Sequence, residues 1–276
     1  MRLLFLGDIL GRSGRDAVID TVPKLRRDHA LDLVVACGEN AAHGFGITGE
    51  ICRQLFAAGV DVITLGNHAF DQREIVDYIK GEPRLLRPLN YPPETPGKGA
   101  GIFHARGGLP VLVTQVICRL FMADNDDPFR ALESCLAQHP MGKGGAVAAA
   151  VIDIHGEASS EKAALAHVAD GKASMAVGSH SHVPTADTRI LPGGTAFQTD
   201  AGMCGPYDSI IGMDPKIAVQ RFRSRVPGDR LEPAGGPATV CGVLTETDNA
   251  TGLAKSVWPI RIGGHLGAAS APPASH

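Results

Sequence analysis

The chain has 276 residues, of which 44% are hydrophobic and 20% are charged, and its formal net charge is -3. This composition is typical of a folded globular protein and excludes a disordered chain. The small net charge does not favour a nucleic-acid groove or an anionic membrane surface as the main binding partner.

Short apolar runs alternate with helical patterns along the chain, and each run predicts a buried strand. In chain order the predicted strands are Leu3 to Gly7, Leu31 to Cys37, Val60 to Leu65, Val111 to Cys118, Ala146 to Ile154 and Met175 to Gly178. Helix-start signals between them are the pairs Ser13 with Asp16, Asp71 with Glu74, and Asp127 with Pro128. A fourth start is Ser159 or Ser160, in a helix that Gly171 can terminate. Repetition of strand and helix predicts an α/β fold.

Two connecting segments differ from the rest of the chain. Residues 87–101 are rich in Pro and Gly, and a connection of this length favours a functional or interface loop over a simple turn. Residues 201–214 are rich in glycine and carry Tyr207 in a Gly-Pro-Tyr-Asp turn. No internal repeat or domain boundary is visible, so we expect one domain over residues 1–265 and a flexible Ala/Ser/Pro-rich tail over 266–276.

Five of the predicted strands end in side chains that can bind a metal ion. These strand ends read Gly7-Asp8, Gly38-Glu39-Asn40, Gly66-Asn67-His68, Asp153-Ile154-His155 and Gly178-Ser179-His180-Ser181-His182. Ligands of open α/β sheets bind outside the carboxyl ends of the strands. The sequence therefore predicts that these side chains meet at one edge of the fold.

Taken singly, most of these residues have an ordinary structural explanation. Asp8 alone is a helix cap, Asn67 a turn residue and His155 a satisfied core histidine. The pair His180 and His182 is more specific, because alternation in an extended segment places both imidazoles on one side. All five strand ends together favour a functional site.

The residue types select a class of metal. The set contains no thiolate, which argues against a structural zinc site, whereas imidazole mixed with carboxylate and amide oxygen suits iron, manganese or zinc. Seven candidate ligands are too many for one ion, so two ions sharing a bridging carboxylate fit better. Two divalent ions carry about +4, and Asp8, Glu39 and a bridging hydroxide leave about +1 for a phosphate anion.

These blocks, in this order, resemble the motifs of calcineurin-like metallophosphoesterases, and specifically the bacterial YmdB-like branch, which has Gly-Glu-Asn where most relatives have Gly-Asp. The resemblance extends through Asn90-Tyr91-Pro92-Pro93, residues 153–162 and residues 199–208, and covers nearly the whole chain. It implies an αββα sandwich of two mixed β-sheets flanked by helices. It also implies a dinuclear iron or manganese centre, divalent or mixed-valence, and activity on phosphodiesters.

The resemblance also assigns roles to residues of this chain. Asp8, Glu39, Asn40 and His182 would hold the first ion, while Glu39 would bridge to a second ion completed by Asn67, His155 and His180. His68 matches the catalytic histidine of the family. Many relatives in the wider superfamily have Asp-x-His in the first block, whereas this chain has Leu10 two residues after Asp8. Leu10 cannot bind a metal, so Asn40 is expected to fill that position.

The predicted activity is hydrolysis of a phosphodiester by a metal-bridging hydroxide, with His68 protonating the leaving alkoxide. Substrates would be small phosphodiesters such as 2′,3′-cyclic nucleotides, or RNA-derived molecules. His43 and Tyr207 are candidate substrate contacts, although a buried turn tyrosine is the ordinary explanation for Tyr207. Two alternatives stay open: a phosphoprotein phosphatase, and a non-catalytic metal-binding regulator that acts through a partner.

Cellular location and assembly are less constrained. The six cysteines include no Cys-x-x-Cys pair, which favours reduced thiols in a cytoplasmic protein. The apolar run at the amino terminus is too short for a signal peptide, and no stretch approaches the roughly 18 residues of a membrane span. A homo-oligomer remains compatible with the long loops.

Overall fold

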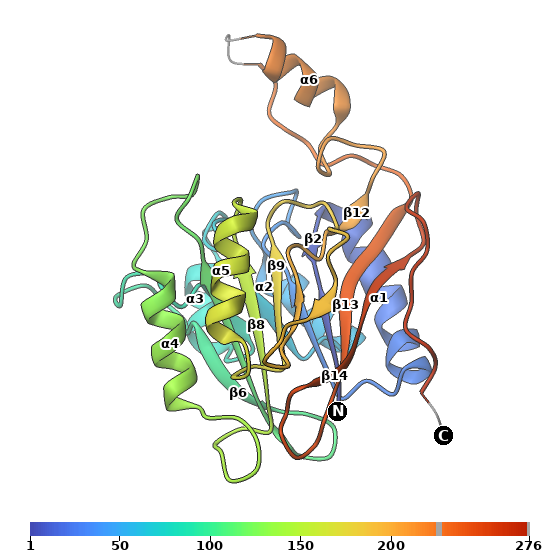
Figure 1. Cartoon of the computed structure of the whole chain (residues 1–276). Helices are drawn as coiled ribbons and strands as arrows, with labels where there is room; N and C mark the ends of the chain where they lie inside the picture. Colours follow the sequence, from blue (N-terminus) through green and yellow to red (C-terminus); the bar gives the residue numbers. More distant parts are fainter. Residues whose placement is uncertain (225–227, 275–276) are drawn as a thin grey trace.

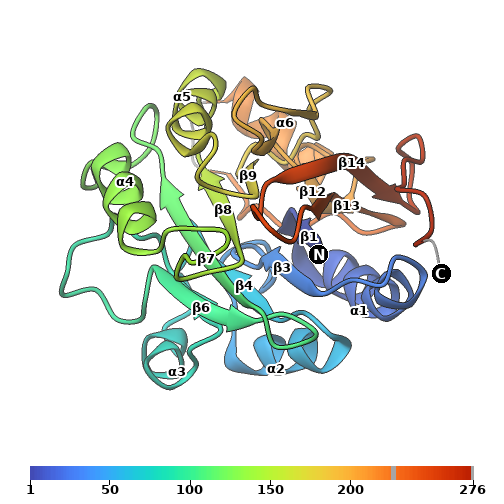
Figure 2. The ribbon, with the colours of Figure 1, turned by 60° about the horizontal axis from the view of Figure 1, so that its bottom comes forward.

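The computed structural model describes residues 1–224 and 228–274, and it shows two packed β-sheets with helices on both outer faces (Figure 1). This arrangement confirms the predicted αββα sandwich. The structure therefore divides into four layers, which Figure 2 shows from the end where the amino terminus lies.

The first sheet is built around parallel strands from the amino-terminal part of the chain. Its order is β2 (Asp8–Ile9), β12 (Met203–Pro206), β13 (Ala238–Thr247), β1 (Arg2–Leu6), β3 (Leu33–Cys37), β4 (Val62–Thr64) and β5 (Leu85–Leu86), with β14 (Ala254–Ile262) paired to β13. Strands β1, β3, β4 and β5 are parallel, and β13 runs antiparallel to β1.

The second sheet has the order β10 (Arg189–Ile190), β11 (Ala196–Gln198), β9 (Met175–Ser179), β8 (Ala149–His155), β7 (Pro110–Ile117) and β6 (Ala100–His104). Strands β7, β8 and β9 are parallel. Figure 1 shows their carboxyl ends at the upper edge of the sandwich, together with those of β1, β3 and β4.

Alternation along each strand divides the hydrophobic side chains between three layers. In β1, Leu3 and Phe5 lie in the cluster between the two sheets, whereas Leu4 and Leu6 lie in the cluster under the helices. The helices over the first sheet are α1 (Gly11–Asp28), α2 (Gly49–Ala58) and α3 (Ile75–Gly81), and those over the second are α4 (Pro128–Gln138) and α5 (Ser159–Ala169). Helix α6 (Pro215–Arg223) projects beyond the upper edge (Figure 1).

Two of the four predicted helix starts are wrong. Helix α1 already begins at Gly11, upstream of Ser13, because the Gly14 N–H already donates to the Leu10 carbonyl at 3.1 Å. Helix α3 begins only at Ile75, because the Asp71 carboxylate contacts the His68 ring instead of capping the chain. The start at Asp127 is confirmed, since its carboxylate accepts hydrogen bonds from the first turn of α4. The start at Ser159 is also confirmed, because α5 begins at this residue.

The ends and the thiols of the chain complete the description. Arg261 and Ala269 pair through both backbone groups and Ala271 is buried, so part of the segment after residue 265 lies against the body. The expected flexibility of residues 266–276 stays a prediction, and its last two residues lie outside the described part. All six cysteines are buried and unpaired, as expected for reduced thiols. Within the described residues, no helix has the length and apolar character needed to cross a membrane.

Candidate metal centre

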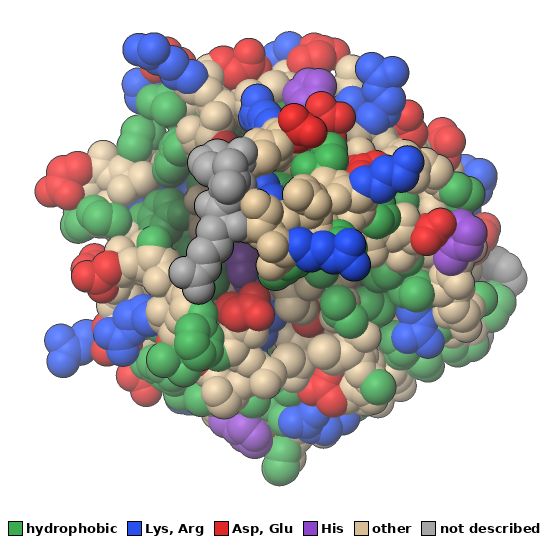
Figure 3. Space-filling model, turned by 90° about the horizontal axis from the view of Figure 1, so that it is seen from above, with side chains coloured by type: hydrophobic (Ala, Val, Ile, Leu, Met, Phe, Trp, Pro, Cys, Tyr) green, Lys and Arg blue, Asp and Glu red, His purple; other side chains and the backbone are tan. Residues whose placement is uncertain are grey.

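The predicted ligands lie at the upper edge of the sandwich, each placed by the end of a strand. Asp8 opens β2 directly after Gly7, and His155 is the last residue of β8. The other positions follow the ends of β3, β4 and β9: Glu39, Asn40, Asn67, His180 and His182. Seen from above, this face has a hollow in which a histidine side chain lies beside an acidic one (Figure 3).

Glu39, Asn67 and His155 direct their acceptor atoms at the same point. The His155 Nε2 atom lies 3.1 Å from Glu39 Oε1 and 2.9 Å from Asn67 Oδ1. Glu39 Oε1 is buried and has no hydrogen-bond partner among the residues that the structure describes. Three atoms whose lone pairs point at one place repel each other unless a proton or a cation lies between them. A metal ion can bind all three.

His180 lies next to this group. Its ring centroid is 4.9 Å from that of His155, and one potential ligand atom of each of Glu39, His155 and His180 lies within 4.8 Å of the others. The Glu157 carboxylate approaches His180 Nε2 at 3.3 Å from the solvent side. We refer to Glu39, Asn67, His155 and His180 as the sheet half of the site.

Asp8, Asn40 and His182 form a second group, which we call the loop half. His182 Nε2 lies 3.3 Å from Asn40 Oδ1 and 3.9 Å from Asp8 Oδ1. The other ring nitrogen, Nδ1, donates to the Ile211 carbonyl at 2.7 Å, so the neutral ring presents Nε2 as an acceptor.

A hydrogen-bonded chain fixes the His155 ring. The Ser179 hydroxyl donates to Asp153 Oδ1 at 2.6 Å, so it accepts from His155 Nδ1 at 2.9 Å. The same carboxylate also accepts from Thr64 and Gln115. Asp153 and Ser179 therefore set which ring nitrogen of His155 faces the site, although no pattern in the sequence assigns this role to them.

Burial and neighbouring charges shift the pKa values of three of these side chains. Burial favours a neutral Glu39, but His155 and His68 outweigh it and lower the pKa of Glu39 to about 2. Burial also opposes a charged His155, but the Glu39 carboxylate raises its pKa to about 9. Burial raises the pKa of Asp8, which its histidine neighbours partly offset. The lowered pKa of Glu39 and the raised pKa of His155 show that each buried charge stabilises the other.

The segment after β9 differs from the prediction. His180 and His182 were expected to share one side of an extended segment, but their φ angles are +95° and +64°. Each ring instead serves a different half of the site. Left-handed backbone is costly for residues with a β-carbon, so the surrounding contacts must hold it.

A buried ion pair provides those contacts. The Lys162 ammonium donates to the Ser179 carbonyl at 2.7 Å and to the Asp200 carboxylate at 2.7 Å. Asp200 in turn accepts from the Ser181 backbone N–H at 3.0 Å. The pair thus ties α5 to the turn that carries both imidazoles, and sequence reasoning missed it.

His68 lies on the open side of the sheet half. Its backbone N–H donates to Glu39 Oε2 at 2.9 Å, and its Nδ1 atom lies 2.7 Å from Asp71 Oδ2. The Phe45 ring packs edge-on against it. With Nδ1 occupied, Nε2 is the nitrogen available for proton transfer to a bound molecule.

The remaining candidates lie nearby with different surroundings. His43 is exposed in a left-handed turn whose next residue, Gly44, accepts a hydrogen bond from Asn40. The Tyr207 hydroxyl is bound to both backbone groups of Met203 and lies 3.3 Å from Cys241 Sγ. This is the arrangement of a turn tyrosine, and a substrate role for either residue stays a prediction.

Cys37 is close enough to Asp8 and His155 to be considered as a ligand. Its Sγ atom lies 3.4 Å from Asp8 Oδ1 in a geometry that suits an S–H donor. Burial and the Asp8 carboxylate raise the pKa of this thiol well above its ordinary value. Cys37 was not among the predicted ligands, and in this geometry its S–H group supports the Asp8 carboxylate.

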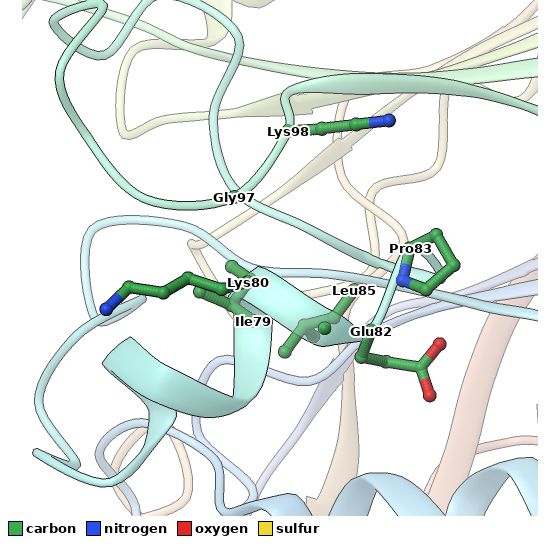
Figure 4. Close-up of a pocket in the computed structure, with 8 residues that line it drawn as sticks. Ile79, Lys80, Glu82, Pro83, Leu85, Gly97 and Lys98 are labelled. Atoms are coloured by element: carbon green, nitrogen blue, oxygen red, sulfur yellow. The ribbon is translucent and has the colours of Figure 1, made fainter.

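One well-formed pocket lies away from this centre. It has a volume of about 310 Å³ and lies between the end of α3 and the Pro/Gly-rich connection, with Ile79, Lys80, Glu82, Pro83, Leu85 and Lys98 in its lining (Figure 4). None of the seven predicted ligands lines it. It therefore adds nothing to the strand-end site.

Comparison with known proteins identifies the family. The sequence profile of the family described as "YmdB-like protein" matches residues 4–260. The chain belongs to this family. A 2′,3′-cyclic-nucleotide 2′-phosphodiesterase of Bacillus subtilis is 44% identical over 262 residues, which cover 95% of this chain and 97% of that protein.

Two crystal structures match the fold of the whole chain. A hypothetical protein from Thermus thermophilus has a TM-score of 0.88 at 41% identity, covering 96% of this chain and 100% of the other. A phosphatase from Mycoplasma pneumoniae has a TM-score of 0.87 at 30% identity, covering 95% and 93%. The YmdB-like chain described here therefore has the metallophosphoesterase type of fold, as its motifs indicated.

Proposed function

We propose that this YmdB-like chain is a two-metal phosphodiesterase that hydrolyses small phosphodiesters, with 2′,3′-cyclic nucleotides as the leading substrate class and RNA-derived molecules as the next. The observation that carries the proposal is the convergence of Glu39 Oε1, Asn67 Oδ1 and His155 Nε2 on one buried point. The relative from Bacillus subtilis, whose name states such an activity, supports the choice of substrate.

The two halves of the site supply the donors for two ions. Asn67, His155 and His180 would hold one ion, and Asp8, Asn40 and His182 the other. Glu39 would bridge them, because its Oε1 atom faces His155 and its carboxylate is ionised over the physiological pH range. Imidazole, carboxylate and amide donors without thiolate suit iron or manganese, which are the ions we propose.

Bound ions would lower the pKa of water and polarise the phosphoryl oxygens of the ester. The chain itself orients its ligands and supplies an acid. His68, held by Asp71 through Nδ1, is the residue proposed to donate a proton from Nε2 to the leaving alkoxide. We place this reaction in the cytoplasm, a location that the six buried, unpaired thiols support.

Metal analysis together with hydrolysis assays tests this function. The purified protein should hold about two ions per chain and should hydrolyse bis-p-nitrophenyl phosphate and 2′,3′-cyclic AMP. Chelation should abolish turnover, and Mn²⁺ or Fe²⁺ should restore it. Absence of bound metal even after reconstitution would contradict the proposal.

The same assays separate the alternatives. A phosphoprotein phosphatase would prefer phosphopeptides to either diester. A regulator that acts through a partner would bind metal fully without turning over any of the three, and its cellular effect would survive His68→Ala. Turnover of diesters that is lost in this variant favours the phosphodiesterase.

A further inference from the structure

We propose that Phe121, in a turn of the loop between β7 and α4, is a stacking platform for the nucleobase of the substrate. The inference rests on the proposed function and deepens it, because it names the feature of a nucleotide that this chain would recognise apart from its phosphate. Four observations support it.

The first observation is exposure. Phe121 has 88% of its surface exposed, which is far more than an aromatic side chain with a structural role would leave in water. It is the third residue of a turn in which the Met122 N–H donates to the Arg119 carbonyl at 3.1 Å. A turn tip on a solvated face ordinarily carries a polar residue or glycine.

The second observation is backbone conformation. Phe121 has a φ of +62°, in the left-handed region that bulky residues rarely adopt. Glycine or asparagine would relieve this strain and would also remove the exposed ring. An exposed ring and a strained backbone are both unfavourable, so their combination at Phe121 indicates that the ring has a function there.

The third observation is that the loop around Phe121 is held on both sides. The buried Asn90 amide donates to the carbonyls of Ile117 and Asp126, which fixes the two ends of the loop. The Glu161 carboxylate of α5 accepts from the backbone N–H groups of Arg119 and Leu120 at 2.9 to 3.1 Å. The ring is therefore presented from a preorganised backbone, which lowers the entropy cost of binding.

The fourth observation is position. Ile117 lies opposite His155 in the register of β7 and β8, and the Cys118 N–H donates to the His155 carbonyl at 2.8 Å. Four residues then lead from Ile117 to Phe121, a reach of roughly 14 Å at full extension. Figure 1 shows the segment between β7 and α4 rising to the upper edge of the sandwich, where the ligand set lies.

These features together favour a nucleobase as the occupant. An exposed aromatic ring on a fixed backbone binds another flat ring by stacking, and every base offers such a face. The platform would therefore distinguish nucleotides from simple phosphate diesters.

Two cyclic esters that differ in the base provide the test. Wild type and Phe121→Ala are compared on 2′,3′-cyclic AMP and on glycerol 1,2-cyclic phosphate, which has the same five-membered ring but no base. We expect kcat/KM for the nucleotide to fall roughly 5- to 150-fold, the loss typical of one stacked base. The glycerol ester should be unaffected. Phe121→Trp should keep the preference, and Phe121→Leu should lose it.

Leu109→Ala is the matched control. Leu109 is also an exposed apolar residue, but it precedes the amino end of β7, at the opposite edge of the sheet from Phe121. The ratio of the two substrates should not change in this variant. Equal losses on both esters in Phe121→Ala, or a change in its oligomeric mass with an unchanged substrate ratio, would overturn the proposal in favour of a structural or subunit contact.

A binding measurement separates this inference from the phosphodiesterase proposal. Isothermal titration calorimetry measures the affinity of the metal-loaded protein for adenosine 3′-monophosphate and for inorganic phosphate. Phe121→Ala should weaken the nucleotide and leave phosphate unchanged, whichever ester is hydrolysed. If wild type turns over neither ester, the proposed function fails, and this comparison alone decides whether Phe121 binds a base.

Discussion

Two histidines of the candidate metal centre, His155 of the sheet half and His182 of the loop half, are held by different kinds of structure. His155, in the sheet half, ends a strand, is fully buried and is held by a chain of side chains through Ser179 to Asp153. His182, in the loop half, has left-handed backbone and is held by the carbonyl of Ile211, a half-exposed residue on the way to α6.

This difference indicates that the two proposed ions bind with different affinities. Donors fixed by the sheet are preorganised, and they lose little freedom when a cation arrives. Donors on a turn depend on contacts that open more easily. We therefore expect the ion of the sheet half to bind more tightly and to leave last during chelation.

The largest expected effect comes from removing the residue that joins the two halves. Glu39→Gln keeps the shape of the side chain but removes the charge of the proposed bridge, so both ions and all measurable turnover should be lost. Elemental analysis and a diester assay check this. Glu50→Gln, on the exposed face of α2, is the control and should behave as wild type. Retention of two ions in Glu39→Gln would exclude a bridging role.

Removing the proposed acid should leave both halves intact. His68→Ala should reduce kcat by roughly 10² to 10⁴, the usual contribution of general acid catalysis, while metal content stays at the wild-type value. Asp71→Asn should have a smaller effect in the same direction, because it removes only the group that orients the ring. A parallel loss of metal in His68→Ala would assign the residue to ligation instead.

Weakening the support of one half tests the comparison directly. Ser179→Ala breaks the chain between His155 and Asp153 and should weaken metal binding in the sheet half by roughly 10- to 100-fold. Stepwise chelation would then show the sheet ion leaving first. Ser181→Ala is the matched control, because Ser181 contributes its backbone N–H to the turn. Simultaneous release of both ions in Ser179→Ala would show that the halves are one unit.

The smallest expected effect is a pH dependence of metal uptake. The pKa of His155 is about 9 in the metal-free protein, so at neutral pH the ring is protonated and must lose a proton to bind a cation. Affinity for the sheet ion should therefore fall about tenfold for each pH unit below the pKa of this ring. Calorimetry in buffers of different ionisation enthalpy should detect about one proton released. Uptake without proton release would mean that the His155 ring is already neutral before the ion binds.

Much of the architecture follows from the sequence because parallel strands and their ends have strong signals. The six predicted strands correspond to β1, β3, β4, β7, β8 and β9. The long hairpin of β13 and β14 was not predicted, and its residues do not alternate regularly between polar and apolar. Strand pairing across distant parts of the chain fixes that hairpin beside β1.

The strand-end residues were predicted as a group, but the geometry that separates them was not. Whether His180 and His182 share a side depends on two left-handed residues, and the Lys162–Asp200 pair that holds them joins positions 38 apart in the chain. Likewise, only the folded register shows that Asp153 supports His155 through Ser179. Local patterns predict which residues reach an edge, whereas side-chain contacts between elements decide what each one does there.

The six buried thiols allow local unfolding of the protein to be measured by cysteine alkylation. Burial raises the pKa of every cysteine in the chain, so none presents a thiolate to a reagent while the fold is closed. Cys37 lies beside Asp8, one of the proposed metal ligands, whereas Cys135 lies on the buried face of α4, in the helical layer over the second sheet. The relative alkylation rates of Cys37 and Cys135 would therefore compare how often the structure opens locally at the candidate metal centre and at the outer helical layer. No label needs to be introduced for this measurement.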